Sequence, residues 1–310
     1  SFDFNCFRIE SISYPLTIIR LVMRHIRLYT LKEILEDKSK PPKPIIDDGI
    51  LLDGTLLMIV AKAKHQKTFL AQNMAISIAF GSDFAGFKVP EAKKVLYFMA
   101  EGGYYPNRDR IQKMCSEQTS NLVMGYPSYL PINRDEEFNH LIETIKLEKP
   151  DVLILDPLKR FHDVDENSAS QMGDIFGRIR KIIEEFKLSV IIIHHAGKVT
   201  SKGGRGSSVI MGEYDSCIEM TKHKDGKTIL KFDMRHVETP PTKELIFNQE
   251  TLWFEERNKV IELIKSEGGV ISKDKFHEMY EKQKSTRYKH IERNVRAKLI
   301  IEESNCLKLP

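Results

Sequence analysis

The segment from Ala61 to Thr68 carries the residues with the clearest chemistry in this sequence. It reads Ala-Lys-Ala-Lys-His-Gln-Lys-Thr and directly follows an apolar run, residues 56–60. A lysine followed by a hydroxyl residue after a strand matches the frame G-x-x-x-x-G-K-[ST] of a phosphate-binding loop. In such a loop the backbone N–H groups and the lysine bind phosphate, and the hydroxyl binds Mg²⁺. The binding residues we expect are Ala61, Lys62, Ala63, Lys64, His65, Gln66, Lys67 and Thr68.

Both glycines of that frame are replaced in this chain, by Ala61 and Gln66. Glycine permits positive φ and lets phosphate approach the backbone closely. A left-handed conformation costs a residue with a Cβ roughly 1–2 kcal/mol, and Gln66 also adds bulk beside Lys67. We therefore expect weak ATP binding, and the sequence leaves open that none is bound.

Two carboxylates follow apolar strands further along the chain. Asp156 ends the run 152–155, where it is placed to hold Mg²⁺ together with Thr68. Glu101 follows the run 95–100, where it is placed to polarise an attacking water molecule. The alternatives are an aspartate that caps the next turn and a glutamate of an ordinary turn.

His194 and His195 end another apolar strand, 190–193. At that edge of a sheet they are placed to contact the terminal phosphate, although a strand can also simply end in two histidines. Neighbouring residues of a strand point to opposite faces, which argues against a shared metal site.

A basic loop, residues 197–208, follows the histidines. Its Lys198 and Lys202 are candidates for contacts with a single nucleic-acid strand, and the alternative is a simple connection. Arg205 in this loop, or Arg235 at the end of a later strand, is a candidate arginine finger that completes a neighbouring subunit's site.

Strands and helices alternate between these motifs, which favours an α/β fold with a largely parallel sheet covered on both faces. The expected strands are 54–60, 95–100, 152–155, 189–194, 216–222 and 228–233, and the expected helices are 68–80, 107–117, 136–147 and 168–186. Asp225-Gly226 between the last two strands predicts a hairpin, so antiparallel strands finish the sheet.

The ordered motifs resemble the plasmid RepA-type hexameric helicases, which are RecA-like ATPases. The resemblance covers about residues 40–250, and it departs from the family pattern at Ala61, Gln66 and Asp233. It is carried by Phe98-Met-Ala-Glu-Gly-Gly, Asp156-Pro-Leu-Lys-Arg-Phe-His, Asp165-Glu-Asn-Ser, Ile-Ile-Ile-His-His-Ala-Gly-Lys and Gly-Gly-Arg-Gly-Ser-Ser.

The resemblance implies a RecA-like, mostly parallel twisted sheet covered by helices, in a homo-oligomeric ring such as a hexamer. It implies ATP with Mg²⁺ at the subunit interfaces and single-stranded DNA in the channel. The residues that match functional positions of the family are Lys67, Thr68, Glu101, Asp156, His194 or His195, and Arg205 or Arg235.

The C-terminal part, residues 255–310, is the basic part of the chain. Residues 256–310 carry 13 Lys and Arg against 9 Asp and Glu, whereas the net charge of the whole chain is only +4. Three short helical patterns followed by a strand pair predict a winged-helix domain. The third helix would contact single- or double-stranded DNA through Lys284, Arg287, Lys289 and Arg293, and the alternative is a protein-interaction module.

The N-terminal part, residues 1–45, precedes the α/β domain of residues 46–254. Residues 16–35 form an amphipathic pattern that predicts a helix packed on its own domain or on a neighbouring subunit, with a membrane-surface helix as the alternative. A proline-rich linker follows at 38–44. No apolar run is long enough to span a membrane, and four widely spaced cysteines are typical of a reduced, cytoplasmic protein.

Three functions remain compatible with the sequence. The first is a ring ATPase that acts on DNA in replication. The second is a non-catalytic DNA-binding or assembly protein that keeps the fold. The third is a recombinase-like or KaiC-like regulatory ATPase. Nucleotide turnover distinguishes the ring ATPase from the non-catalytic protein. Unwinding of DNA strands indicates the ring ATPase, whereas filament formation on DNA indicates the recombinase-like protein.

Overall fold

The computed structural model describes residues 28–195, 212–256, 259–280, 284–296 and 299–310. The chain divides into two units, residues 1–42 and residues 43–310. In the first unit, helix α2 (Leu31–Glu36) begins at Thr30, whose side chain and that of Glu33 form a capping box. The predicted helix over residues 16–35 is not continuous, because residues 28–30 are not helical and α2 begins with its own N-cap. The part of the prediction over residues 16–27 lies outside the described residues. The prolines that follow leave residues 37–44 without helix.

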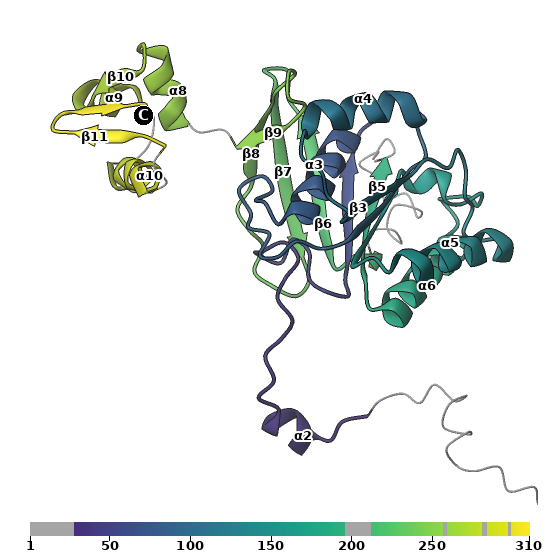
Figure 1. Ribbon diagram of the computed structural model, residues 1–310. Helices are drawn as coiled ribbons and strands as arrows, with labels where there is room; N and C mark the ends of the chain where they lie inside the picture. Colours follow the sequence, from purple (N-terminus) through teal and green to yellow (C-terminus); the bar gives the residue numbers. More distant parts are fainter. Residues whose placement is uncertain (1–27, 196–211, 257–258, 281–283, 297–298) are drawn as a thin grey trace, which may run out of the picture. The chain divides into compact units, whose positions relative to one another are not determined.

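A nine-stranded sheet forms the core of the second unit, in the order β3-β2-β4-β5-β1-β6-β7-β8-β9 (Figure 1). The first six strands of this order are mutually parallel, and the pairs from β6 to β9 are antiparallel. The strands are β1 (Leu56–Ala61), β2 (Val95–Met99), β3 (Leu122–Gly125), β4 (Val152–Asp156), β5 (Ser189–His195), β6 (Ser216–Lys222), β7 (Lys227–Met234), β8 (Lys243–Phe247) and β9 (Phe254–Glu256).

Helices cover both faces of this sheet (Figure 1). Alternate residues of each central strand face opposite sides, so Leu57 and Ile59 of β1 pack with α3 (Lys67–Phe80) in one core cluster. Leu56 and Met58 pack with α5 (Asp135–Glu148) and α6 (Ala169–Phe186) in the other. The arrangement confirms the predicted α/β architecture with a mostly parallel, helix-covered sheet.

The structure corrects several predicted boundaries. Helix α4 (Tyr104–Met114) begins three residues before the predicted start at Asn107 and ends before Glu117. The strand that precedes it ends at Met99, one residue early, because Ala100 already pairs with the backbone of Asp156 beyond the ladder. The sequence does not predict strands β3, β8 and β9. The predicted hairpin is present and joins β6 to β7. Strand β6 pairs with β1 in parallel on its other side.

The C-terminal segment has its own small core. It contains helices α8 (Lys259–Ser266), α9 (Lys273–Met279) and α10 (Lys284–Arg296). Strands β10 (Val270–Ser272), β11 (Ile301–Glu303) and β12 (Cys306–Lys308) form an antiparallel sheet in the order β10-β12-β11. Apolar side chains of the helices and of this sheet, such as Ile264, Phe276 and Leu307, are fully buried together.

Among the described residues, no helix is both long and apolar enough to cross a bilayer.

Asp215, directly before β6, links this strand to the start of β1 through a side-chain hydrogen bond. Its carboxylate accepts hydrogen bonds from the Leu56 amide at 2.8 Å and from Arg180 Nη1 at 2.6 Å, and its side chain is 13% exposed. Although burial by itself raises the pKa of Asp215, the hydrogen bonds from Arg180 and Leu56 bring it below the ordinary value of 3.8.

We therefore predict that Asp215→Asn lowers the free energy of unfolding at pH 7 by about 2 kcal/mol, because a charged hydrogen-bond acceptor is lost. A lowered pKa stabilises the folded state above the unfolded pKa, and this contribution disappears as the pH falls through the folded value. Denaturant titrations should thus show the difference from wild type shrinking below about pH 4. Asp174→Asn, on the exposed side of α6, is the matched control. A pH-independent difference would contradict the assignment.

Candidate functional site

The loop between β1 and α3 has a left-handed conformation at one of the two positions where the frame has glycine, Gln66, and not at the other, Ala61, which ends β1. Lys64 and Gln66 both have positive φ, 64° and 65°, so the loop is left-handed at two residues with side chains. Gln66 is the N-cap of α3 and forms no side-chain capping bond with the helix. The first backbone amides of α3 thus lack a side-chain cap at the end of a helix dipole, which is an arrangement suited to an anion.

Lys67 lies inside this loop and is buried. Its ammonium group donates hydrogen bonds to the backbone oxygens of Ala61 and Lys62, both at 2.9 Å, and lies 3.0 Å from His195 Nδ1. Burial lowers the pKa of Lys67 to about 8, against the opposing charges of Asp156 and Glu101. The lysine is therefore held at the centre of the loop.

Thr68 and Asp156 meet beside the lysine, as expected for two oxygen ligands of Mg²⁺. Thr68 Oγ1 lies 3.4 Å from Asp156 Oδ1, and the Tyr97 hydroxyl donates to Asp156 Oδ2 at 2.7 Å. Burial raises the pKa of Asp156 to about 6, although the hydrogen bonds from Tyr97 and Thr68 act in the opposite direction. Tyr97 is a positioning residue that sequence reasoning missed. The contact depends on the register of β2 with β4, in which Met99 pairs with Asp156 and Tyr97 lies two residues earlier on the same face, so the sequence alone carries no signal for it.

Glu101 lies in the turn after β2. A fully buried amide, Asn107, fixes this turn by donating to the backbone oxygens of Glu101 at 2.9 Å and of Gly103 at 2.8 Å. Gln72 of α3 in turn donates to Asn107 Oδ1 at 3.3 Å. The Glu101 carboxylate faces a cavity of about 370 Å³ and lies 3.4 Å from Arg160 Nε. Sequence reasoning missed both amides, because their partners depend on helix packing.

The two histidines at the end of β5 face different neighbours. His195 is paired in register with Ala61 and contacts Lys67, whereas the charge of Glu166 acts on His194. Burial lowers the pKa of both histidines below the ordinary value, so both are neutral near pH 7. At His194 the negative charge of Glu166 partly opposes this decrease of the pKa. The described residues contain no cluster of three or more His, Cys, Asp or Glu suited to a metal ion.

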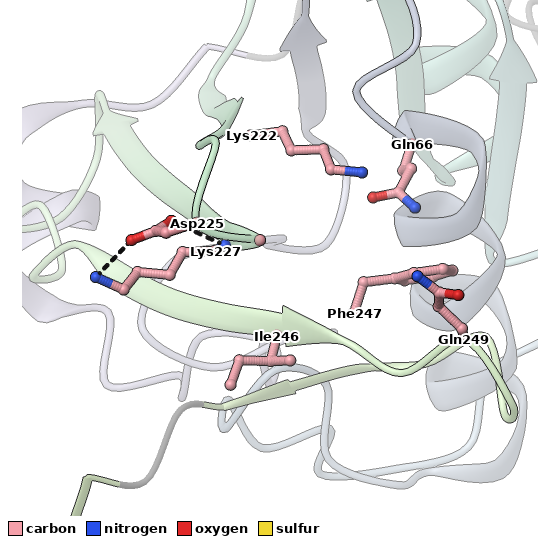
Figure 2. A pocket seen from close by; sticks show the side chains of 8 residues that line it. Gln66, Lys222, Asp225, Lys227, Ile246, Phe247 and Gln249 are labelled. Carbon is pink, nitrogen blue, oxygen red and sulfur yellow. Dashed lines mark hydrogen bonds and ion pairs between the residues drawn. The ribbon is translucent and has the colours of Figure 1, made fainter.

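A second cavity, of about 440 Å³, opens beside the phosphate loop (Figure 2). One wall is apolar, since Phe247 packs against Phe69 and Phe254 with ring centroids 5.2 and 4.9 Å apart. The cavity is lined by Gln66, Lys222, Asp225, Gly226, Lys227, Ile246, Phe247 and Gln249. A cavity with this volume, an aromatic wall and lysine side chains has the size and polarity to hold part of a nucleotide.

Arg235 is not brought to this site. It follows β7, whose last residue, Met234, pairs with Ser216 at the start of β6. Ser216 pairs with Leu57 near the start of β1, so the length of β1 separates Arg235 from the phosphate loop of its own chain. The guanidinium donates to the Gly212 backbone oxygen.

Several other predicted site residues cannot be placed. Lys198, Lys202 and Arg205 lie outside the described residues. Lys284, Lys289 and Arg293 belong to α10, but their side chains are not described. Arg287 donates to the His277 backbone oxygen and so links α10 to α9. The roles of all these residues stay predictions.

The left-handed Gln66 generates a specific prediction. Replacing Gln66 by glycine removes the cost of positive φ, roughly 1–2 kcal/mol, and the bulk beside Lys67. We expect Gln66→Gly to raise ATP affinity at least severalfold in calorimetric titrations and to stabilise the protein. Lys187→Gly, at the left-handed end of α6, is the control that should raise stability alone. Equal ATP affinities of wild type and Gln66→Gly would show that Gln66 does not limit binding.

Comparison with known proteins agrees with this geometry. The chain has the fold of a solved ATPase domain, with a TM-score of 0.52 at 12% identity over 66% of this chain and 86% of that one. A DnaB-like replicative helicase, solved for its interactions with primase, gives a TM-score of 0.50 at 14% identity, and the match covers 66% of this chain but only 57% of the helicase chain. These structures share the fold of this chain, a mostly parallel sheet covered by helices. The AAA_25 family model, described as an AAA domain, matches residues 24–201, more than half of the chain, and the protein therefore belongs to this family of AAA domains.

Proposed function

We propose that the protein is a RecA-like ATPase that binds ATP with Mg²⁺ and works on DNA. The observation that carries this proposal is the convergence of Lys67, Thr68, Asp156 and His195 on the uncapped end of α3. All four lie at the carboxyl edge of the parallel sheet, which is where open α/β sheets bind ligands. The adjoining 440 Å³ cavity gives room for the rest of a nucleotide.

Each residue of the site fits a part of this ligand. When bound, the magnesium nucleotide supplies the phosphoryl bond to be cleaved and the cation that neutralises its charge. Thr68 and Asp156 provide oxygen ligands suited to Mg²⁺, and Lys67 with the amides of α3 binds phosphate. Glu101, fixed by Asn107, accepts the proton of the attacking water.

We further propose that the working form is a ring of identical subunits of the RepA type. The support is the position of Arg235 at the opposite edge of the sheet from the phosphate loop. An arginine in that position can reach a nucleotide only in another copy of the chain, as arginine fingers supplied by a partner do. Arg205 is the second candidate for this role.

DNA is the proposed substrate of the ring, with the C-terminal segment as a winged-helix contact. The support is the excess of Lys and Arg in residues 256–310, together with three helices and an antiparallel sheet around a common core. One of the similar structures is a replicative helicase by name, which agrees with a role in replication. Lys198 and Lys202 are the proposed contacts to a single strand.

A second candidate function is a DNA-binding or assembly protein that does not hydrolyse ATP. Gln66 favours it, because its side chain occupies the loop position where phosphate approaches a glycine in the usual frame. This candidate keeps the fold and the C-terminal segment and assigns no turnover to Glu101.

Two variants separate these functions in the full chain. We expect Lys67→Ala to weaken ATP binding more than tenfold, since the central cation is lost. Glu101→Gln should keep binding and lower the rate of phosphate release by about 10²-fold or more. Circular dichroism establishes that both variants are folded. ATP binding without phosphate release by wild type would favour the non-catalytic protein, and a wild type that binds no nucleotide would refute the ATPase.

The DNA contact is tested with charge-neutralising substitutions in α10. We expect the triple variant Lys284→Gln, Lys289→Gln and Arg293→Gln to bind fluorescent DNA at least tenfold more weakly than wild type in anisotropy titrations. The salt dependence of binding should also become shallower, because fewer counterions are released. Neutralising three lysines of the α/β domain, Lys113, Lys146 and Lys181, is the matched control. An unchanged affinity and salt slope in the α10 variant would remove DNA binding from this segment.

A further inference from the structure

The cavity beside the phosphate loop contains two lysines with different environments. Lys227 Nζ lies 2.9 Å from Asp225 Oδ2, so its charge is already paired. Lys222, at the end of β6, has no ion pair or side-chain hydrogen bond within the described part of the chain. Figure 2 shows its ammonium group directed toward Gln66. The cavity therefore holds one cation that is available to a ligand.

Backbone contacts place Lys222 next to the phosphate loop. Its amide donates to His65 Nδ1 of the loop at 3.2 Å. Two residues earlier, Met220 pairs in register with Ala61, the last residue of β1. Lys222 therefore lies beside the loop that follows β1. Strand β6, which carries Lys222, and strand β5, which carries His195, pair with opposite edges of β1.

The side chain of Gln66, which also lines this cavity, contains a polar atom without a hydrogen-bond partner among the described residues. Its Oε1 atom is enclosed and accepts no hydrogen bond from any described residue. An enclosed acceptor of this kind costs free energy unless a ligand or water supplies a donor. Gln66 and Lys222 both line this cavity, and of the two only the Lys222 ammonium group is available to a ligand in it.

We propose that Lys222 is a second phosphate-binding cation of the nucleotide site, which compensates for the two missing glycines of the loop. A loop with side chains at positions 61 and 66 brings fewer backbone amides close to phosphate. Lys222, on the neighbouring strand β6, would compensate for these lost hydrogen bonds from backbone amides. Its positive charge attracts phosphate over a longer distance than a hydrogen bond does. The ligand class is the phosphate chain of a nucleoside triphosphate.

This inference rests on the proposed nucleotide site, and the experiment separates the two. Calorimetric titrations of the full chain with ATP and Mg²⁺, and with inorganic tripolyphosphate, compare wild type with Lys222→Ala, Lys222→Arg and Lys67→Ala. We expect Lys222→Ala to weaken both ligands about tenfold, and Lys222→Arg to stay within about threefold of wild type, because charge and reach are kept. Binding by Lys222→Ala should also depend less on salt.

Lys224→Ala is the matched control, since Lys224 lies two residues after Lys222, in the turn between β6 and β7, but does not line the cavity. Loss of affinity in Lys222→Ala but not in Lys224→Ala supports the proposal. If both alanine variants bind like wild type while Lys67→Ala loses binding, the nucleotide site stands and the role of Lys222 is refuted. If wild type binds neither ligand, both the site and the role of Lys222 fail. A loss confined to ATP, with tripolyphosphate unaffected, would assign Lys222 to the base or sugar and refute a phosphate contact.

Discussion

The buried ammonium of Lys67 is the constraint on which the site depends. A cation removed from water must be surrounded by acceptors, because an unpaired buried charge is costly. Two of its acceptors are backbone oxygens of the loop itself, from Ala61 and Lys62, and the third is the ring nitrogen of His195. These bonds close the loop around the lysine and tie it to the neighbouring strand β5. The loop thus adopts the shape in which the buried ammonium group of Lys67 has hydrogen-bond acceptors.

This closure explains how the loop keeps a left-handed shape without glycine. The positive φ of Lys64 and Gln66 costs roughly 1–2 kcal/mol at each residue. The hydrogen bonds that Lys67 donates to the backbone oxygens of Ala61 and Lys62 hold the loop in this shape. Glycine therefore is not needed to form the loop. Its absence bears instead on how closely a phosphate can approach, which is a separate requirement.

The sequence predicts those features that depend on chain order alone. Alternation of apolar strands with helices indicates a parallel sheet, and parallel strands present their carboxyl ends at one edge. That rule suffices to group Lys67, Thr68, Asp156 and His195. It also leads to the expectation that Glu101 lies at this edge, and the structure places it in the turn after β2.

Features that depend on register and packing could not be predicted in the same way. Tyr97 reaches Asp156 only because β2 and β4 are neighbours with one particular alignment. The sequence pattern starts a helix at Asn107, whereas this residue lies inside α4 and its amide holds the Glu101 turn. Strand β3 has four half-buried residues at the edge of the sheet, too few for a clear periodicity. Lys222 looks like an ordinary exposed strand residue until the pairing of β6 with β1 is known.

The pKa shifts at the centre of the site show how its charges are balanced. Burial lowers the pKa of Lys67 and raises that of Asp156, so both shifts favour the neutral forms. No ion pair joins the two side chains in the described part of the chain, and each is held by uncharged partners instead: backbone oxygens and a neutral histidine for Lys67, hydroxyl groups for Asp156. A direct ion pair would occupy the lysine and the carboxylate with each other. Because the two charges do not neutralise each other, in the proposed site Lys67 can still attract a phosphate and Asp156 can still attract a metal ion.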